Sequence, residues 1–120
     1  MLADTTANDL SEYATTHQQV QDLIHDHPLI IFSKSYCPHS KNAKALLDRF
    51  TLIQPYKVVE VDQRPDAALV KQALTEISDR GTFPNIFLNG TSLGGMSELQ
   101  QLNDSGKLEE QLKAARQLKI

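Results

Sequence analysis

A run of four apolar residues, Leu29–Phe32, has no polar side, and its two central members are β-branched. A strand that is apolar on both faces must be covered on both faces, as the buried strands of parallel sheets are. The run is also far shorter than the roughly 20 apolar residues that a membrane-spanning helix needs. The chain is therefore expected to place helices on both sides of a sheet.

Helix signals surround this run and the next strand signal. Apolar residues at helical spacing predict a first helix that ends before Pro28. A second helix is expected to begin at Pro38, because proline is favoured at the first helical position. A strand over Tyr56–Val61 follows, and Pro65 and Gly81 bound a third helix. The apolar sides of these three helices are marked by Leu10, Tyr13, His17, Val20 and Ile24, then by Ala43, Leu46, Leu47 and Phe50, and then by Ala68, Leu69, Ala73 and Ile77.

The last third of the chain predicts a hairpin and two short helices. The dipeptide Asn89-Gly90 is the strongest two-residue signal for a hairpin, and it separates a strand over 85–88 from a strand over 91–93. Ser97 is expected to cap a short helix, and residues 108–118 are expected to form the last one.

These elements predict one small α/β domain. Two parallel strands joined by a helix, then a helix and a hairpin, give a four-stranded mixed sheet flanked by helices, with an extra helix at the N-terminus. No repeat, low-complexity tract or linker divides the 120 residues. We expect residues 9–120 to form the domain and residues 1–8, which are small and polar, to be disordered.

The charge balance argues against several classes of partner. The net charge of −3 leaves no basic face to follow a phosphate backbone, so nucleic acid is not expected as a partner. No membrane segment is expected in this chain, and its first residues lack the basic and apolar regions of a signal peptide. A leader or anchor removed from a longer chain would leave the same sequence.

Cys37 is the only cysteine in the sequence. A single cysteine excludes an intramolecular disulfide framework, a paired-cysteine redox motif and a zinc site built from several thiolates of one chain. No metal site is expected. Any redox chemistry of Cys37 must therefore use a thiol supplied by another molecule.

The position of Cys37 favours the thiolate form. It is expected at the N-cap of the second helix, where unpaired N–H groups and the helix dipole attract a negative charge. Lys34 stands three residues earlier and adds a full positive charge, and a cysteine in such a setting has a lowered pKa. A thiol of low pKa departs readily from a mixed disulfide. The alternative is a small buried structural cysteine, which would need none of these neighbours.

Three segments resemble the signature segments of glutaredoxins, in the same order and at similar separations. They are Ser33–Ser40, Gly81–Asn85 and Gly94–Leu99, and the resemblance covers residues 10 to 117. Within the family, the pattern is most similar to the monothiol glutaredoxins of the fungal secretory pathway, which share Ser-Lys before the active site and an Arg-Gly-Thr-x-Pro-Asn segment. The resemblance implies a thioredoxin fold, glutathione as cosubstrate and a cis peptide bond before Pro84.

The resemblance also implies a glutathione site. Lys34 and Lys71 would hold the glycine carboxylate, and the backbone of Phe83 would pair with the tripeptide as a strand edge does. The helix beginning near Ser97 would present N–H groups to the γ-glutamyl carboxylate, and Glu98 would meet the ammonium. The complete expected set of glutathione-binding residues is Lys34, His39, Lys71, Thr82, Phe83, Pro84, Gly95, Ser97 and Glu98.

Simpler roles stay open for some of these residues. Lys71 on a polar helix face is by default a solvated lysine. Glu98 is favourable in the first turn of a helix without any ligand. Gly94-Gly95 is otherwise a turn.

Two positions of the active-site segment depart from the common family pattern. Ser40 stands where dithiol relatives have a second cysteine, so a second glutathione would have to resolve the mixed disulfide on Cys37. His39 stands where the family usually shows tyrosine. The imidazole would lend positive charge to the thiolate only in acid, so weaker and more pH-sensitive handling of glutathione is expected.

Two functions follow from the resemblance. The first is a glutathione-dependent thiol–disulfide oxidoreductase in which Cys37 is the nucleophile and leaving group, acting as a monomer on glutathionylated proteins or small mixed disulfides. The second is a homodimer in which two Cys37 thiolates and two glutathiones hold a [2Fe–2S] cluster. An inert adaptor protein with the same fold is a third possible function.

The subgroup resemblance implies a location in the lumen of the secretory pathway, whereas a free reactive thiol is also typical of the cytoplasm.

Overall fold

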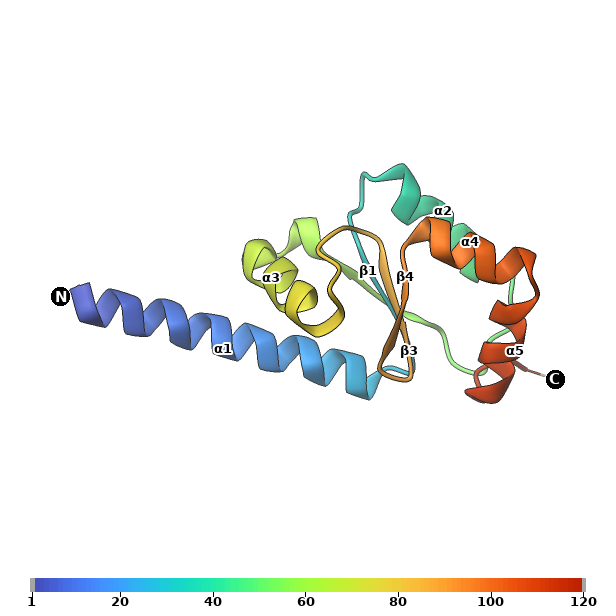
Figure 1. Ribbon diagram of the computed structural model, residues 1–120, viewed down its shortest axis with the longest axis horizontal. Coiled ribbons are helices and arrows are strands. Elements are labelled where there is room, and N and C mark those ends of the chain that lie inside the picture. The colour runs from blue at the N-terminus through green and yellow to red at the C-terminus, as the bar shows by residue number, and fades with distance from the viewer. Residues whose placement is uncertain (1, 120) are drawn as a thin grey trace.

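The computed structural model describes the backbone of residues 2–119 and the side chains of residues 11–119. Its elements, shown in Figure 1, are α1 (Leu2–Asp26), β1 (Leu29–Ser33), α2 (Pro38–Leu47), β2 (Lys57–Glu60), the 3-10 turn η1 (Val61–Gln63), α3 (Ala67–Ser78), β3 (Asn85–Leu88), β4 (Thr91–Gly94), α4 (Met96–Asp104) and α5 (Lys107–Ala114).

The four strands form one mixed sheet in the order β2-β1-β3-β4. Strand β1 runs parallel to β2 and antiparallel to β3, and β4 returns antiparallel beside β3. Asn89 and Gly90 both adopt positive φ angles, 48° and 86°, as a two-residue hairpin turn requires. The predicted four-stranded mixed sheet is confirmed.

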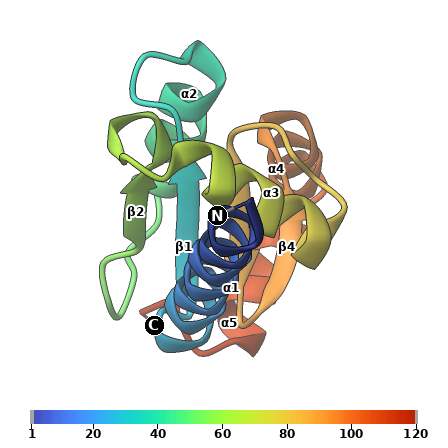
Figure 2. The ribbon, with the colours of Figure 1, turned by 90° about the vertical axis from the view of Figure 1, so that its left-hand side faces the viewer.

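Helices cover both faces of the sheet, and each face has its own apolar core (Figures 1 and 2). Side chains of β1 alternate between the two cores, because successive residues of a strand point to opposite faces. Ile30 and Phe32 pack under α1 and α3, and Leu29 and Ile31 pack under α2, α4 and α5. We name these the α1/α3 core and the α2/α4/α5 core. Both are formed by residues with at most 7% of their surface exposed.

The first helix begins earlier than its apolar pattern indicates. Helix α1 starts at Leu2 and so includes residues 2–8, which the composition predicts to be disordered. No glycine or proline interrupts residues 2–26, and extending a formed helix needs no new nucleation. Met1 and the side chain of Leu10 lie outside the described residues.

Two further helix boundaries correct the sequence predictions. Helix α4 has Gly95 at its N-cap, so Ser97 lies inside the first turn rather than at the cap. Helix α5 ends at Ala114, because Arg116 takes a left-handed φ of 58°. The residues after it do not continue the helix as predicted, and Leu118 instead pairs with Leu52 in an isolated antiparallel bridge. Between residues 2 and 119, no helix has the length and apolarity to cross a membrane.

Candidate active site

Cys37 lies where the chain turns from the end of β1 into α2. It is the N-cap residue of α2, in extended conformation, and Pro38 follows at the start of the helix. The Cys37 N–H donates to the Lys34 carbonyl at 3.0 Å, and the Cys37 carbonyl accepts from the Lys41 N–H at 3.0 Å. These contacts fix the backbone on both sides of the sulfur, while the residue stays partly exposed. The predicted N-cap position is confirmed.

The first turn of α2 lowers the pKa of the Cys37 thiol. The largest cause is the backbone N–H of Ser40; partial burial opposes it, and the N–H of His39, the Ser40 hydroxyl and the charge of Lys34 add to it. No N-cap hydrogen bond of regular geometry joins the sulfur to the helix, so these groups act as aligned dipoles around it. The sequence predicts that Lys34 is a main cause of the lowered pKa of Cys37, but Lys34 lowers this pKa less than the first turn of α2 does.

Ser40 is fully buried beneath the reactive loop. Its hydroxyl oxygen accepts a hydrogen bond from the Lys34 N–H at 3.1 Å, which leaves the hydroxyl proton to stabilise the Cys37 thiolate. Ser40 therefore stabilises the reactive loop. It stands at the position where a dithiol glutaredoxin has its second cysteine.

A carboxylate from another element also holds the reactive loop. Asp62, in η1, accepts from the Ser35 N–H at 2.8 Å and from the Ser35 hydroxyl at 2.5 Å. The sequence analysis missed this pair, although a signal existed. Because β1 and β2 are parallel, the residues that follow them meet at the same edge of the sheet.

Lys34 faces the segment that contains the cis proline. The peptide bond between Phe83 and Pro84 is cis, as expected. Extending the β1–β3 register by two residues places Lys34 opposite Phe83, and the Lys34 ammonium lies 5.3 Å from the centre of the Phe83 ring. The lysine is thus held beside Phe83 by a cation–π contact.

A hollow of about 160 Å³ opens beside this segment, between α2 and the start of α4. Six of the predicted glutathione-binding residues line it together with Arg80 and Met96; they are His39, Phe83, Pro84, Gly95, Ser97 and Glu98. Thr82 lies next to the hollow, where its hydroxyl accepts from Arg80 at 3.0 Å. Lys71 does not line the hollow: it is exposed on α3, with its Cε beside Gly81.

Arg80 is a further site residue to which the sequence analysis gives no role, although it opens the Arg-Gly-Thr-x-Pro-Asn segment. Its guanidinium pairs with the Glu98 carboxylate, and the same Glu98 oxygen accepts from the Gly95 N–H at 2.8 Å. Glu98, expected to meet an ammonium, is therefore already engaged by a cation and by the start of α4. A Cβ at Gly95 would lie 2.8 Å from the Arg80 guanidinium and 3.1 Å from the Pro84 carbonyl oxygen, so a larger residue there would displace Arg80 from this arrangement.

The described residues contain no cluster of three or more His, Cys, Asp or Glu side chains able to hold a metal ion. The chemistry on offer is that of one activated thiolate beside a strand edge, a helix N-terminus and the cations Lys34 and Arg80.

The family model for glutaredoxin matches residues 29–93, which is more than half of the chain. The chain belongs to the glutaredoxin family. It is therefore a glutathione-dependent thiol oxidoreductase, and its fold is the thioredoxin-like fold that the resemblance implied.

Individual glutaredoxins agree with this assignment. Glutaredoxin-C4 of Arabidopsis thaliana is 42% identical over 93 residues, which are 78% of this chain and 67% of that protein. Monothiol glutaredoxin-7 of Saccharomyces cerevisiae is 37% identical over 87 residues, 72% of this chain and 43% of that protein. A crystal structure of a buckwheat glutaredoxin–glutathione complex superposes with a TM-score of 0.84 at 28% identity, over 91% of this chain and 97% of that one. The plant relative is the more similar of the two sequences, so the comparisons do not single out the fungal monothiol subgroup.

Proposed function

We propose that this glutaredoxin reduces mixed disulfides of glutathione by a monothiol mechanism. The observation that carries the proposal is that Ser40, and not a second cysteine, lies on the same helix turn as Cys37. The only cysteine of the chain has a lowered pKa, and the residue placed to attack it from the same helix carries a hydroxyl. A hydroxyl does not displace a disulfide sulfur near neutral pH, so the second thiol must come from solution.

The proposed cycle has two exchanges. The Cys37 thiolate attacks the glutathione sulfur of the substrate, a bond forms between Cys37 and glutathione, and the substrate leaves as a thiolate that takes a proton. A second glutathione thiolate then attacks the glutathione sulfur on Cys37, forming glutathione disulfide and releasing the Cys37 thiolate. The lowered pKa of Cys37 favours the second step, because it makes Cys37 the better leaving group.

The hollow supports binding of glutathione beside Cys37. The Phe83 backbone offers a strand edge for the cysteinyl residue, and Lys34 offers a charge to the glycine carboxylate. Arg80 and the N-terminus of α4 would receive the γ-glutamyl carboxylate, and its ammonium would compete with Arg80 for Glu98. Lys71, which reaches over Gly81, remains a proposed contact of the glycine carboxylate.

A glutathionylated peptide tests the mechanism. With glutathione and a coupled reductase, the native protein should turn over the peptide, and a mass spectrum without free glutathione should show one glutathione on Cys37. Cys37→Ser should lose both, whereas Ser40→Ala should keep turnover. Loss of all turnover in Ser40→Ala, with its fold intact, would contradict the monothiol cycle.

The cluster-bridged homodimer is a separate prediction. One chain offers a single thiolate, so four sulfur ligands would require two chains and two glutathiones. Visible absorption after anaerobic purification with glutathione tests it, and its absence in Cys37→Ser is the matched control.

The cellular site is likewise proposed from the subgroup resemblance alone. We place the protein in the lumen of the secretory pathway, with the cytoplasm as the alternative. Fractionation of cells that express the intact gene product distinguishes the two.

A further inference from the structure

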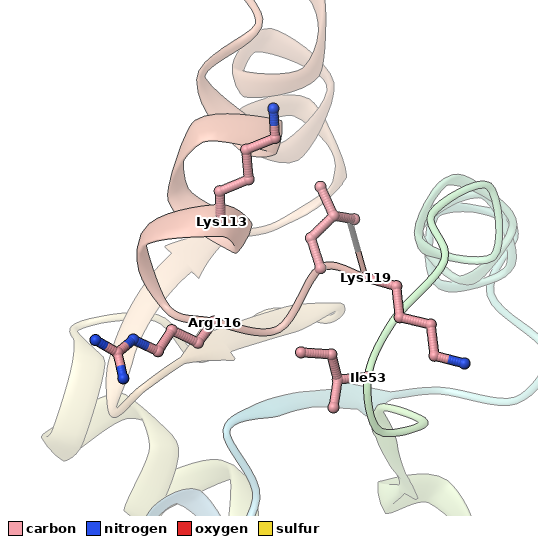
Figure 3. Close-up of a pocket in the computed structure, with 5 residues that line it drawn as sticks. Ile53, Lys113, Arg116 and Lys119 are labelled. Carbon is pink, nitrogen blue, oxygen red and sulfur yellow. The ribbon is translucent and has the colours of Figure 1, made fainter.

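A second hollow lies at the end of the molecule away from Cys37, where the chain after α5 meets the loop between α2 and β2 (Figures 1 and 3). Its volume is about 650 Å³, within the range of small-molecule sites. It is lined by Ile53, Lys113, Arg116, Leu118 and Lys119. None of these residues contributes to the glutathione site.

Two backbone segments form a fixed wall of this hollow. The Ile53 N–H donates to the Gln117 carbonyl, and the Lys119 N–H donates to the Thr51 carbonyl, both at 2.8 Å. The two segments also share an antiparallel bridge. Side chains on this wall are therefore held by paired backbone rather than by a free loop.

The centre of the hollow is apolar. Ile53 is 52% exposed although its backbone is pinned, and Figure 3 shows it between Arg116 and Lys119. Leu118, from the other segment, is partly buried beside it. The two aliphatic side chains together offer an apolar ligand a contact surface inside the hollow.

The rim of the hollow is cationic. Figure 3 shows the charged ends of Lys113, Arg116 and Lys119 directed away from Ile53 and in three different directions, so their methylene stems line the wall and their charges stand at separate points of the edge. This gathering occurs on a chain with a net charge of −3. Lys113 has an exposed carboxylate at 3.3 Å, that of Glu109, whereas no salt bridge involves Arg116 among the described residues. The rim is therefore open to an external anion.

We propose that this hollow binds a fatty acid anion. The alkyl chain would cover Ile53 and Leu118, and the carboxylate would pair with Arg116, whose planar fork suits two oxygens. An apolar floor under a cationic rim fits an amphiphile with a negative head and disfavours one with a positive head.

Titration with sodium decanoate, below its micelle concentration, tests the proposal. Amide resonances of residues 51–53 and 113–119 should shift and saturate, and decyltrimethylammonium should leave them unchanged. Ile53→Asp should weaken binding about tenfold, because it removes the apolar contact. Arg116→Asn, which tolerates the left-handed backbone, should weaken it about fivefold. Lys107→Gln, an exposed change elsewhere on α5, and Cys37→Ser should bind as the native protein does.

Several results would overturn the proposal. Equal binding of the cationic amphiphile, or native affinity in a folded Ile53→Asp protein, would exclude a fatty acid site. Shifts that follow protein concentration without decanoate would identify a second copy as the occupant. Binding to anionic vesicles but not to decanoate would identify a membrane surface instead.

Discussion

At the scale of single residues, the reactivity of Cys37 depends on the first turn of α2 more than on the nearby lysine. The N–H groups of Ser40 and His39 and the Ser40 hydroxyl surround the sulfur, whereas the Lys34 ammonium lies over the Phe83 ring. Lys34 therefore faces the place of the ligand, and its effect on the pKa of Cys37 is the smallest of the causes.

This division predicts different results for two substitutions. Ser40→Ala keeps the backbone N–H but removes the hydroxyl, so it should raise the pKa of Cys37 modestly. Lys34→Met should raise it less, and should instead raise KM for a glutathionylated substrate about tenfold, the effect of losing a hydrogen bond to a charged group. The pH dependence of alkylation by iodoacetamide measures the pKa values. A larger pKa change in Lys34→Met than in Ser40→Ala would contradict the assignment.

Arg80 gives a second prediction at this scale. Its guanidinium joins Thr82 to Glu98 at the edge of the hollow. Arg80→Leu should raise KM for glutathionylated substrates about tenfold while leaving the alkylation rate of Cys37 unchanged, because Arg80 acts on the ligand and not on the sulfur. Arg49→Leu, an exposed arginine beyond the end of α2, is the matched control. Equal KM values in the two variants would remove Arg80 from the site.

At the scale of elements, η1 fixes the loop that carries Cys37. Hydrogen bonds from the Ser35 hydroxyl and N–H lower the pKa of Asp62. A carboxyl group whose pKa is lower in the folded protein stabilises that state above its unfolded pKa, near 3.9, and loses the effect as the pH falls through the folded value.

The difference in melting temperature between native and Asp62→Asn protein should therefore be greatest near pH 7. It should shrink as the pH falls below about 4. Thermal unfolding followed at a series of pH values measures this. A difference that stays constant down to pH 2 would show that the carboxylate charge is not what holds the loop.

The elements also show how far the sequence alone could predict the site. The strand at Leu29, the N-cap at Cys37 and the hairpin at Asn89-Gly90 follow from local patterns, and each is confirmed. The pairs Ser35–Asp62 and Arg80–Glu98 join residues 27 and 18 positions apart. No local pattern encodes such pairs, because they depend on how the strands and helices come together. Glu98 is expected to meet a ligand for the same reason: the sequence does not show that Arg80 pairs with it.

At the scale of the whole molecule, α1 extends beyond the rest of the fold (Figure 1). Val20 and Ile24, in its C-terminal half, enter the α1/α3 core, and Tyr13 packs against the same core. Isolated helical turns in water are marginal, so we expect residues 2–8, although helical, to add little to the stability of the fold.

Deleting residues 1–8 should therefore leave the free energy of unfolding within about 0.5 kcal/mol of the native value and should not change turnover. Urea unfolding measures the first and the coupled assay the second. Val20→Ala, in the core half of the same helix, should by contrast lower the unfolding free energy by about 1 to 3 kcal/mol. A deletion as costly as Val20→Ala would show that the N-terminal turns are part of the folded unit.

The residues of the proposed glutathione site come from both sides of the sheet that separates the two cores. The nucleophile and the N–H groups of α4 stand on helices of the α2/α4/α5 core, whereas Lys71 and Arg80 belong to α3 and the turn after it, on the side of the α1/α3 core. A glutathione molecule bound at the edge of the sheet would contact residues of both helical layers. Bound glutathione would then stabilise both helical layers against unfolding, including the distant helix α1.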